Sequence, residues 1–510
     1  MAVSKWRTLV CGTICCLAAA TATSEDMGRG PAAAGEATGP SRLHELLARQ
    51  LTIVRSKAPA WIRELSSDRI DPRAAAGEDT VQLVIQQDRS DGTDLLTLRP
   101  VDPMYRACYA DGSELRVRHG RDAMTEEIRQ VCGASEAEAF GRFCEWLTKL
   151  YELEMPTFIE RSFDSPLDLA SPLRPALDLV RLGGFRRLAR VVSSYFDDER
   201  LQRIFTFQSM YAGLAPYEAL AIYAVITYMD SVNGVFVPVG GMHALPVALA
   251  AAAERAGASF RYDTRVDRIL LAQGTSGRVT GVRLADGEVV EADAVIANPD
   301  LPVAYRTLLP GTPMPLMARR GDYSPSALVW HVGVRGDLPP GTEHHNIHFG
   351  HDWDGAFRAI LRDGIRMPDP SLLVSVPSLH EPTMAPVGAH ALYVLEPTPN
   401  LDGRVDWTRE RSRARDDLYA ALDRLGYPTA IEVEELVDPL DWEAQGMERG
   451  TPFALSHKFR QTGPFRPGNL EKRAPGLVFA GSGTIPGVGV PMVLVSGMLA
   501  AQRVEAMGAR

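Results

Sequence analysis

The sequence predicts an α/β protein in which a second, antiparallel sheet accompanies the first. Three observations favour this class. The chain has 510 residues, too many for one ordinary core, so two closely packed domains are expected. Helical patterns and short strand patterns follow one another through its middle. The chain then ends on a buried strand, a glycine-rich loop and a helix.

Composition and charge narrow the class of protein further. Hydrophobic residues make up 45% of the chain and charged residues 23%, as in ordinary globular proteins. The net charge of −10 argues against a nucleic-acid binder, which needs a basic face. The six cysteines include no Cys-x-x-Cys pair, so neither a structural zinc site nor a disulfide framework is expected. The main part of the chain is therefore typical of a cytosolic, thiol-reduced protein.

The first 25 residues have the plan of a secretory signal. Lys5 and Arg7 precede the apolar run Thr8–Ala22, which is too short to span a bilayer. The alternative is a spurious upstream start. Residues 24–42 are small, polar and rich in Gly and Pro, as in linkers, and residues 43–66 show some helical periodicity.

The elements expected after this segment are read from hydrophobic periodicity and from turn residues. The predicted helices are Trp146–Glu160, Leu177–Tyr195, Tyr217–Met229, Gly241–Gly257 and Met492–Glu505. The predicted strands are Ser259–Tyr262, Arg265–Leu271, Val279–Leu284, Val289–Ala297, Gly476–Ala480 and stretches within 370–400 and 430–437. An Asp286-Gly287 hairpin turn separates two of these strands.

The loop after the last strand is the clearest candidate for a binding site. It carries Gly481, Gly483, Gly487 and Gly489, and glycines at this density let a backbone approach a planar ligand closely. Pro491 suits the first turn of a helix, where its missing N–H costs nothing. The free amides and positive dipole end of that helix would face the ligand and favour negative charge on it. The alternative is a plain strand–turn–helix with loop glycines.

Several long motifs resemble one family. The C-terminal run GSGTIPGVGVPMVLVSGMLAAQR is similar to the FAD signature of bacterial phytoene desaturases, in a variant of actinobacterial type. Further segments resemble the family in the same order, among them LRPVDPMYRACYADG (98–112), NGVFVPVGGMHALPVALA (233–250) and PLDWEAQGMERGTPFALSHKFRQTGPFRPGN (439–469). The chain thus resembles the FAD-dependent carotenoid desaturases, a branch of the amine-oxidase-like flavoproteins.

The resemblance implies a fold and a reaction. The fold is an FAD-binding Rossmann-like domain with an inserted α+β substrate domain. The reaction is the desaturation of phytoene, a C40 polyene, towards lycopene, with oxygen or a quinone as the electron acceptor and FAD carrying most of the chemistry. The alternatives are a related flavoprotein carotenoid oxidoreductase or isomerase, and a non-catalytic remnant without FAD.

The resemblance also implies site residues. The cofactor-binding residues expected from it are Val266, Gly481, Ser482, Gly483, Thr484, Gly487, Gly489, Val490, Pro491 and Met492. The stretch Phe163–Asp168 resembles a family segment in which a proton acceptor has been proposed, so Asp168 is the catalytic candidate. Ser171 stands where some relatives carry a basic residue, which puts a paired role in doubt. The alternative is that Asp168 caps a helix or faces solvent.

One family feature is missing from the sequence. Dinucleotide-binding domains open with a strand and the turn G-x-G-x-x-G, which holds the pyrophosphate at a helix N-terminus. No such motif occurs here, since GRGPAAAG (28–35) has the wrong spacing. We therefore expect that the first βαβ unit is missing or replaced, through a frameshift or a misassigned start, and that FAD binding is impaired in the chain as written.

These observations divide the chain into six parts. They are a signal-like segment or spurious start (1–25), an atypical, partly disordered segment (26–93), a mainly helical, substrate- and membrane-facing part (94–240), an FAD-domain helix with hairpins (241–300), the substrate-domain sheet (301–465) and the C-terminal FAD-binding strand, loop and helix (466–510).

The substrate sets an expectation for localisation. Phytoene is insoluble, so an enzyme that uses it must collect it from a membrane surface. The stretch Leu177–Val192 mixes arginines with Leu, Val and Phe, as in basic helices that lie on anionic lipid. The alternative is a solvated arginine face. The expected location is cytoplasmic and peripheral to the membrane, with secretion as the alternative if residues 1–25 are a signal.

Overall fold

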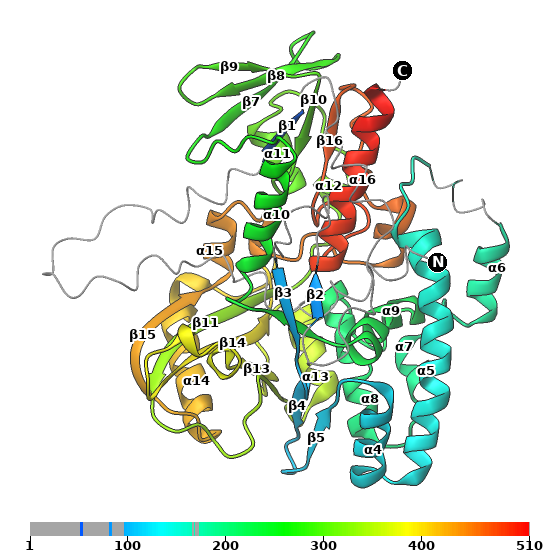
Figure 1. Cartoon of the computed structure of the whole chain (residues 1–510), viewed down its shortest axis with the longest axis vertical. Coiled ribbons are helices and arrows are strands. Elements are labelled where there is room, and N and C mark those ends of the chain that lie inside the picture. The colour runs from blue at the N-terminus through cyan, green and yellow to red at the C-terminus, as the bar shows by residue number, and fades with distance from the viewer. Residues whose placement is uncertain (1–50, 55–80, 84–95, 166–167, 169–172, 509–510) are drawn as a thin grey trace, which may run out of the picture.

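The computed structural model of the chain describes residues 51–54, 81–83, 96–165, 168 and 173–508 (Figure 1). The predicted α/β class is confirmed. In Figure 1 a small antiparallel sheet lies at the top, a large sheet at the lower left and a group of helices at the right. The predictions for residues 1–25, and for most of residues 26–93, fall outside the described residues.

A small parallel pair of strands forms the centre of the nucleotide-binding type of domain. β10 (Ala294–Ala297) runs parallel to β16 (Leu477–Phe479) and antiparallel to β1 (Leu51–Val54). Apolar residues of β10 and β16 pack on α11 (Leu301–Thr307) and on α16 (Val490–Gly508). The two strands are apolar without alternation because both of their faces are covered.

An antiparallel meander extends this domain. β7 (Val266–Leu271), β8 (Val279–Leu284) and β9 (Val289–Glu291) pair in that order, after helix α10 (Ala244–Arg255). The predicted Asp-Gly turn joins β8 to β9, and Gly287 has the positive φ of 94° that such a turn needs.

The second part of the protein is built on a seven-stranded mixed sheet. Helix α14 (Trp407–Arg424) covers one face of it and buries its apolar side there. In spatial order the strands are β15 (Ala430–Val437), β11 (Ser326–Arg335), β14 (Ala389–Thr398), β13 (Leu372–Ser375), β12 (His345–His348), β4 (Tyr105–Cys108) and β5 (Glu114–Val117). The strand predictions within 370–400 and 430–437 are thereby confirmed.

The helices at the right of Figure 1 enclose a core rich in aromatic rings, including Phe140, Phe143 and Phe205. They are α4 (Arg121–Val131), α5 (Ala134–Glu154), α6 (Leu173–Arg181), α7 (Leu188–Val192), α8 (Glu199–Ile204) and α9 (Ala224–Tyr228). The other short elements are β2 (Val81–Leu83), β3 (Leu96–Pro100), β6 (Phe236–Pro238), α12 (Leu316–Arg320), α13 (Trp353–Arg358) and α15 (Pro439–Ala444). Among the described residues no helix is both long and apolar enough to cross a bilayer.

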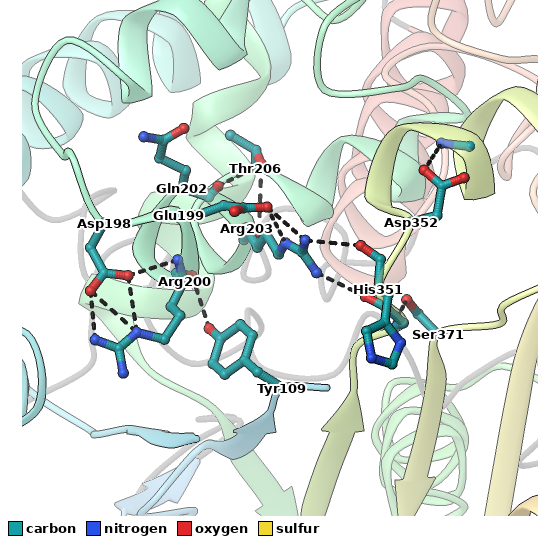
Figure 2. A network of polar contacts seen from close by, with 12 residues as sticks. Tyr109, Asp198, Glu199, Arg200, Gln202, Arg203, Thr206, His351, Asp352 and Ser371 are labelled. Carbon is teal, nitrogen blue, oxygen red and sulfur yellow. Dashed lines mark hydrogen bonds and ion pairs between the residues drawn. The ribbon is translucent and has the colours of Figure 1, made fainter. Parts of the chain in front are cut away.

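Helix α8 fastens this helical part to the large sheet (Figure 2). The Arg203 guanidinium donates to the carbonyl oxygens of Gly350, at 2.8 Å, and His351, at 3.3 Å. From the sheet side, the Tyr109 hydroxyl donates to the carbonyl oxygen of Arg200, at 2.9 Å. The helical part and the sheet are therefore joined by polar contacts as well as by the shared core.

Two of the helix predictions need correction. The stretch Leu177–Tyr195 is not one helix, because α6 ends at Arg181 and α7 begins at Leu188. Between them Gly183 adopts a φ of 78°, and a Cβ on Gly184 would lie 2.7 Å from the Leu179 side chain, so the chain turns there. Similarly, the prediction Tyr217–Met229 holds only from residue 221 onward, as a 3-10 turn, α9 and a π turn (229–233). That part is largely buried, as expected for an apolar segment.

Two strand predictions and one expectation of helical structure also differ from the structure. The stretch Ser259–Tyr262 forms no strand, since β7 begins only at Val266, after Asp263 with its positive φ of 54°. The stretch Val289–Ala297 is split into β9 and β10, which belong to different sheets. Helical periodicity was expected over residues 43–66, yet residues 51–54 pair as strand β1 with β10. In these segments, strand formation depends on pairing with strands that are distant in the sequence.

The missing first βαβ unit stays a prediction. The structure describes only β1 and β2 of the chain before residue 96, and the segments between and around them lie outside the described residues. The boundaries of the six predicted parts likewise stay predictions. The large sheet takes β4 and β5 from residues 94–240 and its other strands from residues 301–465, so it joins two of those parts.

Candidate functional site

The glycine loop and its helix lie where the sequence predicts them. β16 leads into the loop 481–489, and α16 starts at Val490. The loop folds back onto the second turn of α16, because the Gly481 amide donates to Ser496 Oγ at 3.1 Å and Thr484 Oγ1 lies 3.1 Å from the same oxygen. The loop is thus fixed at its first half, and its second half leads directly into the helix start.

The second half of the loop presents unused backbone donors. Among the described residues, no hydrogen bond is made by the amides of Gly487, Val488, Gly489, Val490 and Met492. They stand at the positive end of the dipole of α16, an arrangement that suits an anionic group. A reduced flavin carries negative charge at its N1–C2=O edge, so these amides fit the ring system of the expected FAD.

The loop glycines are required by close packing. A Cβ on Gly487, whose φ is 140°, would overlap the imidazole of His457. A Cβ on Gly481, whose φ is 105°, would lie 2.6 Å from Asn298 Nδ2. No side chain fits at either position without moving its neighbour. Glycine therefore serves here both for backbone conformation and for close approach.

A buried arginine holds the loop from behind. Arg466 is 2% exposed, and its guanidinium donates to the carbonyl oxygens of Ser482 at 2.7 Å and Thr484 at 3.0 Å. Further bonds reach the carbonyl oxygens of Leu455 and Gln461, at 3.1 and 3.3 Å. Burial lowers the pKa of Arg466 to about 10, which still leaves the side chain charged at neutral pH. The loop carbonyls therefore point away from the site and towards the arginine.

His457 completes the wall behind the loop. It is buried, its Nδ1 lies 3.4 Å from Thr462 Oγ1, and its Nε2 has no hydrogen-bond partner. Burial holds the pKa of His457 well below its usual range, so the ring is neutral. The hydroxyl of Tyr223 donates to the His457 carbonyl oxygen and ties this segment to the helical part.

Arg466 and His457 were missed in the sequence. Both lie in the motif SHKFRQTGPFR, which supported the resemblance, but nothing in their local spacing marks them as neighbours of a loop some twenty residues further on. A buried charge opposite a glycine loop is visible only in the fold. The one local signal is that Arg466 stands between Phe465 and Pro467, a charged residue with apolar neighbours.

Asp168 occupies a turn beside the far half of α16. Its carboxylate accepts the amides of Asp164 and Ser165, at 2.8 and 2.9 Å, and these bonds hold the pKa of Asp168 below its usual value. Asp164 pairs with Arg503, which lies roughly 20 Å along the helix from its start at 1.5 Å per residue. These contacts favour the alternative, a turn-stabilising residue, and its role as the proton acceptor stays a prediction.

Val266 begins β7 and pairs with Leu284 of β8, in the meander rather than in the loop. Its contact with the adenosine end of FAD stays a prediction. Nearer to the loop, the Asn298 amide donates to the Ala480 carbonyl oxygen at 3.0 Å, which links the end of β10 to the start of the loop. The described residues thus bring together Gly481–Met492 and leave Val266 and Asp168 apart from them.

We expect Gly487→Ala to weaken FAD binding by about tenfold or more, and to lower the free energy of unfolding by about 1–3 kcal/mol. The added methyl must displace His457 or the loop. FAD titration and thermal unfolding measure the two effects.

Gly497→Ala is the matched control, since a Cβ there meets nothing within 4 Å and alanine favours a helix over glycine. It should unfold at the same or a higher temperature. If Gly487→Ala behaves like this control, the close packing of loop and imidazole does not matter for the site.

Comparison with known proteins places the chain in a family. The model of the family "Flavin containing amine oxidoreductase" matches residues 92–505. The chain is 45% identical over 489 residues to a phytoene dehydrogenase of Streptomyces griseus, covering 92% of this chain and 94% of that protein. It is 37% identical over 422 residues to a zeta-carotene-forming phytoene desaturase of Myxococcus xanthus, covering 80% and 79%.

A solved structure, cyclohexylamine oxidase from Brevibacterium oxydans, has a TM-score of 0.47 at 16% identity and covers 81% of this chain and 83% of that one. The Streptomyces alignment extends into the segment before residue 94, in which the sequence holds no G-x-G-x-x-G turn. The chain belongs to the flavin-containing amine oxidoreductases, and the FAD predicted from its sequence is the cofactor of that family.

Proposed function

We propose that the chain is an FAD-dependent desaturase of phytoene, which it converts towards lycopene. The arrangement that carries this proposal is the start of α16, where free amides and an apolar wall meet. Met492, two residues into the helix, packs on a buried cluster that contains Tyr151, Met155, Val225 and Met229. The thioether and aliphatic side chains of this cluster suit a hydrocarbon polyene.

Relatives support the same substrate class. The proteins from Streptomyces griseus and Myxococcus xanthus are both named for phytoene. When bound, the flavin supplies the oxidation by taking hydride from an allylic carbon. The residues of this chain then have to hold the ring at Gly487–Met492 and exclude water with the methionine wall, formed by Met155, Met229 and Met492. They also have to keep the polyene in a fixed position against the ring. Oxygen or a quinone is the proposed final electron acceptor.

A membrane surface is the proposed source of the substrate. Helix α6 exposes Leu173, Leu177 and Val180 on successive turns, at 62, 47 and 58% exposure. Exposed arginines lie on the same helix at 174 and 181, and others follow it in the chain at 186, 187 and 190. An apolar stripe with a basic border supports peripheral attachment to anionic lipid from the cytoplasmic side.

An aromatic patch leads from this surface to the cofactor loop. Exposed Phe185 contacts Phe459, whose ring centroid lies 6.1 Å away, and Phe459 contacts Phe465 at 6.0 Å. Arg466 directly follows Phe465 in the chain and His457 precedes Phe459 by two residues, and both support the loop. A polyene taken up at the patch would therefore enter next to the loop.

One observation favours a second candidate, a remnant that no longer binds FAD. The sequence has no G-x-G-x-x-G turn for the pyrophosphate, although it keeps the C-terminal glycine loop.

The first test is conversion of phytoene by the whole chain. Expressed in phytoene-accumulating cells, it should yield coloured polyenes separable by chromatography, and the purified chain should show a flavin absorption band. Colour formation with a bound flavin is the expected result. A chain without flavin and without product would establish the remnant instead. Isomerised phytoene with no new double bond would favour a carotenoid isomerase.

The second test concerns the membrane. Replacing Leu173, Leu177 and Val180 together by serine should reduce co-sedimentation with phosphatidylserine-containing vesicles several-fold, and added salt should weaken the wild-type binding. Val387→Ser, at a residue 99% exposed elsewhere, is the matched control and should bind as the wild type does. Equal binding by all three proteins would contradict the proposed surface.

A further inference from the structure

Glu154 is a buried carboxylic acid without a partner. It is the last residue of α5, is 5% exposed, and its Oε1 has no hydrogen-bond partner. No cation from any described element reaches it, and burial alone raises its pKa well above the usual range. An uncompensated buried acid costs stability, so such a group calls for an explanation.

Each of the other buried acids of the described residues has at least one hydrogen-bond or ion-pair partner. Their partners are the Asp197 amide for Glu136, the Gln208 amide for Asp230, Arg366 for Glu396, Arg411 for Asp438 and Arg473 for Glu471. Glu154 differs from this set, and its position explains why.

Glu154 borders the start of α16. The next residue, Met155, belongs to the apolar cluster on which Met492 packs. The titratable group facing Glu154 is Tyr223, whose pKa is raised by burial and, to a smaller degree, by the charge of Glu154. Tyr223 in turn bonds the segment of His457, whose ring lies against Gly487. The acid is therefore connected to the methionine wall through Met155, and to the cofactor loop through Tyr223 and His457.

We propose that Glu154 accepts the proton that the polyene loses during desaturation. This inference rests on the proposed function. Two hydrogens leave adjacent carbons, one as hydride to the flavin and one as a proton to the Glu154 carboxylate. The electron pair of the second C–H bond forms the new double bond, and the carboxylic acid later releases its proton to water.

The location and the chemistry of Glu154 suit this role better than those of Asp168. Asp168 is held by two amides beside the far half of α16, and its lowered pKa makes it a weak base. Glu154 lies by the helix start in apolar surroundings, where a carboxylate is a stronger base. It must be ionised to act, so activity should rise with pH through its raised pKa and fall below it.

Glu154→Gln is the direct test, because it keeps the shape and removes the base. Its rate of phytoene conversion should fall by about 100-fold or more, the usual contribution of a general base, while FAD binding stays unchanged. Glu152→Gln, an exposed acid two residues earlier on the same helix, is the matched control and should act as the wild type does. Glu154→Asp should restore part of the rate and keep the rise of activity with pH.

A readout without turnover accompanies these rates. In the chain alone, infrared spectra recorded over a pH series should show a protonated carboxyl band that fades as the pH rises, that Glu154→Gln removes and that Glu152→Gln keeps. Full activity of Glu154→Gln, or a protonated Glu154 band that persists at the pH of maximal activity, would overturn the inference. If Glu154→Gln does not fold, Glu154→Asp decides the question. A rate and a pH profile of Glu154→Asp that both equal those of the wild type would count against the role. An inactive wild-type chain would instead refute the proposed function itself.

Discussion

The buried guanidinium of Arg466 is the contact on which the cofactor loop depends. It holds the carbonyl oxygens of Ser482 and Thr484 on the side away from the helix start. With its carbonyls turned back, the loop can present the amides of Gly487–Val490 and Met492 forward. The cost of burying a charge is met by four backbone oxygens rather than by a carboxylate, so no anion competes with a ligand at this place.

The same short segment connects the loop to the substrate side. Residues 457–466 begin with His457 against Gly487 and end with Arg466, while Phe459 and Phe465 between them reach the surface beside Phe185. This one segment thus supports the cofactor loop on its inner face and forms part of the proposed entrance on its outer face. A substitution in residues 457–466 should therefore affect both the cofactor loop and the proposed entrance.

Local signals predicted the parts of the site that are contiguous in the chain. β16, the glycine loop and α16 could be read directly, because a buried strand, left-handed glycines and an apolar helix follow within some thirty residues. The sequence could not show what these residues contact. Arg466 and His457 come from another segment, and only the fold brings them to the loop. Periodicity likewise continued through Gly183 and Gly184 and so concealed the turn between α6 and α7. The pairing of β1 with β10 depends on a strand far along the chain.

The central claim is that the start of α16 holds the flavin ring, and hydrogen–deuterium exchange of the chain with and without FAD tests it most directly. The amides of Gly487, Val488, Gly489, Val490 and Met492 have no partner among the described residues and should exchange fast in the chain alone. The account predicts that FAD slows their exchange more than that of the meander β7–β9. Binding of FAD that leaves these amides unprotected would contradict it.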